Sequence, residues 1–407
     1  MTNRAFRRMF RRASVLLTDG LGTLIAAPII LVVRILRPFV RIRFGYFTSD
    51  RIGHFAFDVE IYLTEKKINQ DKKFSIDLFF FSGKSANTYF TKMCRRSFVV
   101  HSVIKWLYFA NEILPFGSSH RILPARVTSD SRDIRGLFNK KRAQLRFNDQ
   151  ENQFGLEYLQ EMGLRQGDRF VCLAVRDQAY LNQTYNERDW SYHNFRDTKI
   201  ESYEAAVVAL AERGFWVFRM GKVVDSQLSV DHPRVVDYAT SKHRSDFLDI
   251  WLMAHCYFAI STGLGLDSIA DIFRRPIVFV NYLPILDLEA WGPYITVPKQ
   301  LSWLSTYKPL TLQEQLQHTS LNGHYYEEKG IQVCDLNPSE ITETVLEMEA
   351  RLSGSWVEKD EDIRLHEKFW SELRAWPTFS KYHGWIHPEA RLGAHYLRRS
   401  KDWLFNS

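Results

Sequence analysis

Short apolar runs alternate with amphipathic segments along most of this 407-residue chain. Between residues 43 and 129 the apolar runs are RFGYFT, FSIDLFFF, SFVVHS and RILPARV, and helical patterns separate them. One of these patterns, RIGHFAFDVEIYL, is expected to open a helix at Gly53 and His54. Continuous apolar runs of this length are typical of parallel strands that are buried on both faces. The pattern predicts an α/β domain here.

The same alternation resumes after a polar stretch at residues 130–152, which we expect to be helical. Apolar runs then recur as RFVCLAVRD, FWVFRMG, RVVDYA, YFAIST, PIVFVN and GIQVCDLN, with helical patterns such as SDFLDIWLMAHC between them. Gly214 marks the end of one helix, and Asn337 with Pro338 and Glu340 marks the start of another. These features predict a second α/β domain over residues 155–350.

The last part of the chain, residues 351–407, contains a helical pattern, EKFWSELRAW, and an irregular aromatic stretch. Four tryptophans lie in it, at positions 370, 376, 385 and 403. Tryptophan side chains bury large apolar areas, so we expect this tail to dock onto the body of the protein.

The basic charge of the chain is concentrated at its beginning. The formal net charge is +7, yet residues 1–43 alone hold nine arginines and a single acid, Asp19, which leaves the remainder close to neutral. A neutral body whose aromatic residues lie in apolar runs argues against a nucleic-acid-binding protein.

Residues 20–33 are uncharged and mostly apolar, with arginines on both sides. The run is shorter than the roughly 20 residues needed to cross a bilayer as a helix. Starting the run at Ala13 gives 21 residues, but that span contains Asp19 and Pro28. No small-residue cleavage site follows the run as in a signal peptide. We expect peripheral or monotopic attachment to anionic lipid at the cytoplasmic face of the inner membrane. A single span and a buried core element are the alternatives.

The four cysteines are far apart and form no CxxC pair, which favours reduced, buried thiols and gives no sign of structural zinc.

The segment ISTGLGLDSIADIF, from Ile260 to Phe273, places small residues between a buried strand and a helix. Glycine permits a tight turn, and free N–H groups at a helix start favour an anion. We expect phosphate binding here, at the carboxyl end of a strand; an ordinary βα turn is the alternative. The candidate residues are Ser261, Thr262, Gly263, Gly265 and Asp267.

A long loop follows the strand RFVCLAVRD and is rich in charged residues, which favours a functional segment over a simple connection. The strand ends with Arg176, and the loop contains His193, Arg196 and Asp197; if these three are helical, they share one face. We expect the two arginines to bind the donor phosphates and His193 and Asp197 to act in catalysis. A solvated charged loop is the alternative.

Two further turns carry candidate residues. In FRMG, Arg219 would supply a cation to a diphosphate, and Gly221 would permit the turn at the strand end. A surface arginine without a function is the alternative. At the first strand-to-helix turn, Asp58 lies one helical turn after His54 and would orient its imidazole as a base; a helix-start histidine without catalytic function is the alternative.

With these segments, the chain resembles a family of bacterial putative glycosyltransferases encoded with surface-polysaccharide genes. The resemblance rests on DRIGH, DWSYHNFRD, FRMG and STGLGLDSIAD and covers most of residues 43–350; DWSYH…RD is its most specific part. More distantly, the segment from Ile260 onward is similar to the donor-binding stretch of heptosyltransferases and other enzymes of the GT-B fold. This resemblance implies that Thr262, Gly263 and the following turn hold a donor diphosphate. The heptosyltransferase base is an aspartate after glycine, where this chain has His54 after Gly53.

The resemblance implies two Rossmann-like domains facing across a cleft, preceded by a membrane-associated helix. The expected divisions are residues 1–43 for the membrane segment, 44–154 for the acceptor domain, 155–350 for the nucleotide-sugar domain and 351–407 for the docked tail.

We expect a membrane-associated glycosyltransferase that moves a sugar from a nucleotide-sugar to a glycan or lipid-linked acceptor in surface-polysaccharide synthesis. Cations and helix N–H groups would stabilise the leaving diphosphate, so no metal or other cofactor is expected. A sugar-nucleotide 2-epimerase on the same fold and a non-catalytic scaffold of a polysaccharide assembly complex are the alternatives.

Overall fold

The protein has a mixed α/β fold that divides into two compact units, Met1–Ser131 (unit 1) and Arg132–Ser407 (unit 2). The computed structural model describes residues 3–69, 75–179 and 195–405, with side chains from residue 19 onward. The division falls before the boundary expected near residue 154, because α7 (Asp149–Glu161) packs within unit 2. There the Trp251 indole donates a hydrogen bond to Asn152 over 3.3 Å, and its ring lies against Gly155.

Unit 1 contains a parallel sheet of three strands in the order β1-β2-β3, namely β1 (Arg41–Phe47), β2 (Ser75–Phe81) and β3 (Val99–Val100). Alternate side chains point to opposite faces. Phe44 and Phe80 pack with α1 (Asn3–Ile35) and α4 (Ile104–Ile113) on one face. Phe47 and Phe79 stack at 4.5 Å on the other face, where α2 (Ile52–Asn69) and α3 (Thr88–Ser97) contribute aromatic rings.

The predicted run RILPARV forms almost no strand. Arg121 makes an isolated parallel bridge to Phe44, and the chain then enters the short helix α5 (Ala125–Ser129). Pro124 precedes this helix and lacks the amide hydrogen that a longer strand would need.

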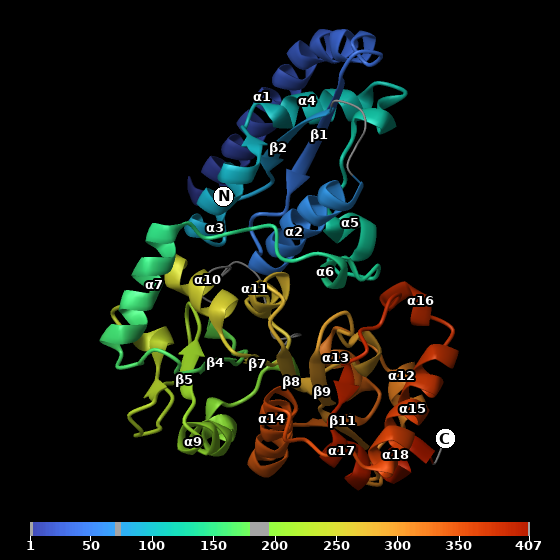
Figure 1. The fold of residues 1–407 in the computed structure, drawn as a ribbon. Helices are drawn as coiled ribbons and strands as arrows, with labels where there is room; N and C mark the ends of the chain where they lie inside the picture. Colours follow the sequence, from blue (N-terminus) through green and yellow to red (C-terminus); the bar gives the residue numbers. More distant parts are fainter. Residues whose placement is uncertain (1–2, 70–74, 180–194, 406–407) are drawn as a thin grey trace. The chain divides into compact units, whose positions relative to one another are not determined.

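Helix α1 belongs to unit 1 and packs along α4 (Figure 1). Its Ala26, Ile30 and Val33 are buried in the core together with Ile104 and Tyr108. Asp19 forms an ion pair of 2.5 Å with Lys105. None of the described helices has an apolar stretch long enough to cross a membrane.

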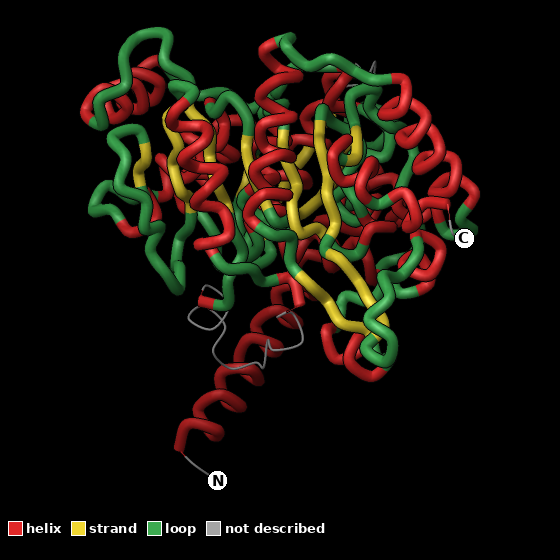
Figure 2. Tube along the Cα trace, turned by 90° about the horizontal axis from the view of Figure 1, so that it is seen from below, coloured by secondary structure: helices red, strands yellow, loops and turns green. Residues whose placement is uncertain are grey.

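Unit 2 is built on a seven-stranded, all-parallel sheet with the order β12-β9-β8-β7-β4-β5-β6. Figure 2 shows its strands lying side by side behind a layer of helices. The strands are β4 (Phe170–Ala174), β5 (Trp216–Met220), β6 (Val235–Val236), β7 (Ala259–Ser261), β8 (Ile277–Tyr282), β9 (Tyr294–Pro298) and β12 (Arg391–Leu392). The buried strands β4, β5, β7 and β8 match the predicted apolar runs.

Two groups of helices cover this sheet. Helices α7 and α11 (Asp267–Ile272) both contact α10 (Asp246–His255), whereas α9 (Glu204–Glu212) contacts α14 (Pro338–Ser353). The predicted boundaries of two of them are confirmed. Gly214 has a φ of +91° just after α9, and the Asn337 side chain caps α14 reciprocally with Glu340.

Three features of unit 2 differ from the prediction. GIQVCDLN contributes β11 (Ile331–Cys334), but this strand pairs antiparallel with β10 (Gln300–Trp303) outside the main sheet, and β9 and β12 were not predicted. The polar stretch 130–152 contains only α6 (Leu137–Lys140) and the start of α7. The carbonyl groups of Phe138 in α6 and of Lys141 just after it accept hydrogen bonds from Arg274, which satisfies them where the helix ends.

The C-terminal tail docks onto unit 2, as predicted. Strand β12 extends the main sheet beside β9, and Trp370 and Trp403 are buried. The remaining helices of the tail and of the preceding segment are α12 (Leu312–Gln317), α13 (Gly323–Glu328), α15 (Asp360–Ala375), α16 (Phe379–Tyr382), α17 (Ala394–Arg399) and α18 (Lys401–Phe405). The four cysteines are free, and Cys94, Cys172 and Cys256 are buried.

Candidate functional site

The order of the strands in unit 2 reverses between β4 and β7. The chain runs from β4 outward through β5 and β6, then returns to the other side of β4 as β7 and continues to β8 and β9. Ligands of open parallel sheets bind at the carboxyl ends of the strands at such a reversal. The Arg176 amide after β4 donates a hydrogen bond of 3.0 Å to the Thr262 hydroxyl after β7, so the two strand ends are tied together.

The loop after β7 is fixed by its own side chains. Gly263 has a φ of +73°, and a Cβ there would lie 3.0 Å from the Tyr282 ring, so the position requires glycine. The Ser261 hydroxyl accepts from the Gly263 amide over 3.1 Å and donates to the Asp267 carboxylate over 2.6 Å. The same carboxylate oxygen accepts from the Leu264 amide over 2.8 Å.

The loop therefore differs from the predicted anion site. The amides of Gly263 and Leu264 are occupied by Ser261 and Asp267, and Ser261, Thr262 and Asp267 are themselves buried. Burial raises the pKa of Asp267 to about 6, although its hydrogen bonds from Ser261 and Leu264 oppose this shift. Of the predicted loop residues, Gly265 is the exposed one.

Three cationic residues lie at or near this loop, and we call Arg176, Arg196 and Lys299 the cation cluster. Arg196 contacts the loop through its side chain and Arg176 through its backbone amide, whereas Lys299 contacts Asp197, the neighbour of Arg196. Arg196 donates to the Gly263 carbonyl over 2.7 Å, and Arg176 donates to the Asp197 carboxylate over 3.1 Å. Lys299 donates to the Asp197 carbonyl over 2.8 Å. Arg196 thus reaches the loop directly, and Asp197 connects the other two cations.

Two acids partly neutralise the cation cluster. Asp197 pairs with Arg176, and Asp335 pairs with Lys299 over 2.6 Å. Burial raises the pKa of Asp197, while the charges of Arg176 and Lys299 act to lower it. Ionised, these two carboxylates leave the five groups with a net positive charge.

Asn281, near the end of β8, fixes both acidic segments. Its side-chain amide donates to the Thr198 hydroxyl over 3.2 Å, and its carbonyl oxygen accepts from the Leu336 amide over 2.7 Å. Thr198 follows Asp197 directly, and Leu336 follows Asp335. Asn281 holds a left-handed conformation, with φ of +56°, which asparagine tolerates better than most residues.

The FRMG segment forms the end of β5 and the turn at Gly221, and Arg219 does not contact the cation cluster in the hydrogen bonds and ion pairs of the described residues. Arg219 is 1% exposed; its guanidinium lies 3.4 Å from Asp237 and donates to the Ser226 carbonyl over 3.1 Å. A Cβ at Gly221 would meet Val224 at 2.5 Å, so the glycine allows a close turn. We therefore regard Arg219 as an interior ion-pair residue.

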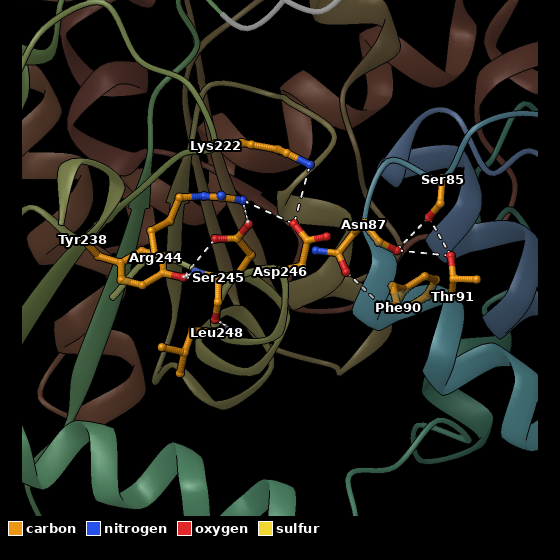
Figure 3. Close-up of polar contacts among 11 residues, drawn as sticks. Ser85, Asn87, Phe90, Thr91, Lys222, Tyr238, Arg244, Ser245, Asp246 and Leu248 are labelled. Atoms are coloured by element: carbon orange, nitrogen blue, oxygen red, sulfur yellow. Dashed lines mark hydrogen bonds and ion pairs between the residues drawn. The ribbon is translucent and has the colours of Figure 1, made fainter. Parts of the chain in front are cut away.

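The segment after this turn contributes to a polar network at the start of α10 (Figure 3). Lys222 lies 3.5 Å from Asp246, and Arg244 lies 2.6 Å from Asp249. The Tyr238 hydroxyl donates to Asp249 over 3.0 Å and accepts from the Ser245 amide over 2.9 Å. These bonds fix the entry into α10, whose N-cap is Ser245. In unit 1, Figure 3 shows the corresponding cap of α3, where Asn87 accepts from the Phe90 amide.

In unit 1 the segment after β1 leads into α2, which carries His54 and Asp58. The Asp58 carboxylate accepts from the Thr48 amide over 2.9 Å and from the Arg126 amide over 3.0 Å, so both of its oxygens bind the backbone. His54 instead contacts the Ser131 hydroxyl through Nδ1 over 2.8 Å. The expectation that Asp58 orients His54 is corrected: Asp58 ties α5 to the end of β1.

The environment of His54 favours its neutral form. Burial lowers the pKa of the imidazole, and the charges of Arg126 and Arg51 lower it further, against the opposing effect of Asp130 and Asp50. A neutral imidazole has one nitrogen that can accept a proton. His193 and the rest of DWSYH lie outside the described residues.

Sequence reasoning missed Lys299, Asp335 and Asn281. The asparagine at the end of PIVFVN was visible as a polar residue closing a buried strand. Lys299 follows β9, which was not predicted, so its place at the sheet edge had no signal in the sequence. Among the described residues, no group of three or more histidine, cysteine, aspartate or glutamate side chains is arranged to hold a metal ion.

Comparison with protein-family models and with curated proteins gives no match. Among solved structures, the chain is similar to a glycosyl transferase family 9 protein from Veillonella parvula, with 10% identity, a TM-score of 0.40, and coverage of 64% of this chain and 86% of the other. It is also similar to the ADP-heptose LPS heptosyltransferase II of E. coli, with 10% identity, a TM-score of 0.40, and coverage of 77% and 99%. A dodecameric iron-containing heptosyltransferase in complex with ADP-heptose matches with 9% identity, a TM-score of 0.37, and coverage of 77% of each chain.

Proposed function

We propose that this protein is a glycosyltransferase that uses a nucleotide-sugar donor, with the donor diphosphate held by the cation cluster of unit 2. The observation that carries the proposal is that Arg176 and Arg196 both contact the Thr262–Gly263 loop at the point where the strand order reverses, with Lys299 bound to the adjacent Asp197. Because the loop amides of Gly263 and Leu264 are engaged internally, the diphosphate is held by the side-chain cations and not by these backbone groups.

The proposed reaction breaks the bond between the anomeric carbon and the diphosphate oxygen. The diphosphate leaves with the electron pair, the acceptor hydroxyl oxygen bonds to the anomeric carbon, and a base takes the acceptor proton. Cations that lie ready around the leaving group stabilise the negative charge as it develops. The cation cluster supplies this charge without a metal ion, so we expect transfer to continue when a chelator is added.

We propose His54 of unit 1 as the base. Its lowered pKa keeps the imidazole able to accept a proton near neutral pH. The Ser131 hydroxyl at Nδ1 would fix the orientation of the ring, in the place that we first gave to Asp58. His54→Gln is expected to lower the transfer rate about 10²- to 10⁴-fold while leaving the affinity for nucleotide unchanged.

Calorimetry with UDP, GDP, ADP and CMP tests the donor site. One of these nucleotides should bind, and Arg196→Gln should weaken that binding roughly tenfold or more, because a charge-assisted contact is lost. Arg213→Gln is the matched control, since Arg213 is an exposed arginine of the same unit at the end of α9. The proposal fails if none of the nucleotides binds, or if the two variants bind alike.

We further propose that the acceptor is a glycan or a lipid-linked saccharide of surface-polysaccharide synthesis, and that the enzyme works at the cytoplasmic face of the inner membrane. The arginine-rich, apolar N-terminus supports this part of the proposal. Incubating a nucleotide-sugar without acceptor distinguishes the epimerase alternative, which predicts an isomerised sugar. A scaffold would remain functional in a polysaccharide-deficient strain after simultaneous change of His54, Arg196 and Thr262.

A further inference from the structure

Between Gly20 and Ile35, helix α1 has two apolar faces, and the structure buries only one of them. Gly22, Thr23, Ala26, Ile30 and Val33 face the core of unit 1. The opposite face carries large aliphatic side chains at a helical spacing that are all at least half exposed: Leu21, Leu24, Ile25, Ile29, Val32 and Ile35. Leu24 and Ile35 are 72% and 73% exposed. A helix that is apolar on all sides is normally buried on all sides.

A second element continues this exposed face. Ile113, the last residue of α4, is 74% exposed, and Phe116, in the loop before the following 3₁₀ turn, is 91% exposed. Arg34 of α1 joins this loop to the helix, since its guanidinium donates to the carbonyl groups of Asn111, Leu114 and Pro115. The loop therefore adjoins the end of α1 that carries Ile35.

The backbone of this loop is strained where it presents the aromatic ring. Phe116 has φ of +66° and ψ of +23°, a left-handed conformation that is unfavourable for a residue with a side chain. A phenylalanine that is both strained and exposed stabilises neither the loop nor the core. Such a residue persists when it has a function at the surface.

The charges around this surface are suited to anionic lipid. Residues 1–18 contain five arginines and no acid. Asp19, the one acid of the segment, is neutralised by Lys105. After the apolar run, Arg34 and Arg43 bind groups inside unit 1. Arg34 donates a hydrogen bond to Asn111 of α4, and Arg43 forms an ion pair with Asp77. Most of the other arginines of this segment thus precede the apolar run in the sequence, within residues 1–18.

We propose that the outward face of α1 and the Phe116 loop form one monotopic membrane-insertion surface, with α1 lying in the plane of an anionic bilayer. A helix that crossed the bilayer would present both faces to lipid, whereas Asp19 and the inner face of α1 are fixed to unit 1. The exposed residues of α1 are aliphatic, which suits lipid chains, while protein interfaces are enriched in tyrosine, tryptophan, methionine and arginine. The inference deepens the proposed membrane association and does not depend on the transferase chemistry.

Flotation of the full-length protein with vesicles tests the surface. The wild type should bind vesicles of phosphatidylcholine mixed with phosphatidylglycerol, and Ile25→Asp and Phe116→Asp should each weaken binding about tenfold or more, because an apolar side chain is withdrawn from lipid. Val357→Asp is the matched control, since Val357 is 79% exposed but lies in unit 2. Binding should persist in high salt, which removes purely electrostatic attachment.

A second variant separates membrane insertion from folding. Phe116→Gly relieves the left-handed strain, so it should raise the midpoint of thermal unfolding by a few degrees while weakening vesicle binding as much as Phe116→Asp. Unfolding cannot explain a loss of binding in a more stable protein.

Two results would overturn the inference. One is flotation that is unchanged in both Ile25→Asp and Phe116→Gly. The other is a dimer in solution that becomes monomeric with Phe116→Asp and does not bind vesicles, which would make this surface an interface between two copies of the chain. Nucleotide binding by the same samples is measured alongside, so that failure of the membrane surface and failure of the donor site are told apart.

Discussion

At the scale of single residues, the surroundings decide what a polar side chain can do. Asp58 lies one helical turn from His54, as a catalytic partner would, but the backbone amides of Thr48 and Arg126 take both of its oxygens. Burial raises the pKa of Asp58 to about 6, and these two amide hydrogen bonds act against that shift. Residue type and spacing therefore placed Asp58 correctly on the helix, one turn after His54, and its hydrogen-bond partner incorrectly.

Asp58→Asn is expected to destabilise the protein by about 1–3 kcal/mol, because one oxygen becomes an NH₂ group that faces a backbone N–H. The pKa of His54, followed by NMR, should stay nearly constant, since Ser131 is the partner of the imidazole. A large change in that pKa would show instead that Asp58 interacts with the imidazole of His54.

The two effects of Asn281 can be separated by paired substitutions. Asn281→Gly and Asn281→Ala both remove the bonds to Thr198 and Leu336, but only alanine strains the left-handed backbone. We expect alanine to cost about 1 kcal/mol more than glycine in denaturant unfolding. Both variants should weaken nucleotide binding; normal affinity in both would show that Asn281 does not support the cation cluster.

At the scale of elements, helix packing explains why two glycines of the same helix differ in the space available for a side chain. Gly20 and Gly22 both lie in α1, and a Cβ at Gly20 meets nothing within 4 Å. A Cβ at Gly22 would lie 2.5 Å from the Trp106 ring of α4. The glycine at position 22 is therefore what allows α1 and α4 to approach closely.

This pair predicts opposite effects of the same substitution. Gly20→Ala should stabilise the protein by about 0.5–1 kcal/mol, because alanine is the better helix former. Gly22→Ala should destabilise it by about 1–3 kcal/mol, since the tryptophan ring must move. Denaturant unfolding of both variants provides the measurement, and equal effects would mean that α1 does not pack on α4 in this way.

At the scale of the whole molecule, buried groups of unit 2 give opposing dependences of stability on pH. Burial raises the pKa of Asp267 to about 6, so its carboxyl ionises more readily in the unfolded chain, and its contribution to stability is lost as the pH rises from about 4 to 6. Burial lowers the pKa of His383 to about 4, so its contribution is lost as the pH falls from about 6.5 to 4. The two groups partly cancel in the wild-type profile.

Variants separate the two contributions. Between about pH 4.5 and pH 7, the stability of Asp267→Asn relative to the wild type should rise by about 2 kcal/mol, and that of His383→Gln should fall by about the same amount. Urea unfolding at both pH values provides these differences, in which the constant cost of each substitution cancels. If the free energy of unfolding changed with pH in the same way in the wild type and in both variants, the titrations of Asp267 and His383 would be excluded as a cause of the pH dependence.

The sequence by itself determined the elements that depend on local pattern. Buried apolar runs became β4, β5, β7 and β8, the capping box at Asn337 began α14, and four tryptophans indicated a docked tail, because each signal lies within a few neighbouring residues. The basic charge of the N-terminus and the need for a glycine in the loop after β7 were also evident from the sequence.

Only the tertiary structure decided which groups meet. Arg176, Arg196 and Lys299 come from distant segments, and their gathering depends on the strand order of the sheet, which no local pattern encodes. The same applies to Ser261 and Asp267, which accept hydrogen bonds from the loop amides, and to α1, which is apolar on both faces between Gly20 and Ile35. Hydrogen bonds and burial are settled by proximity in space, and the two faces of one helix become different only when one of them is covered.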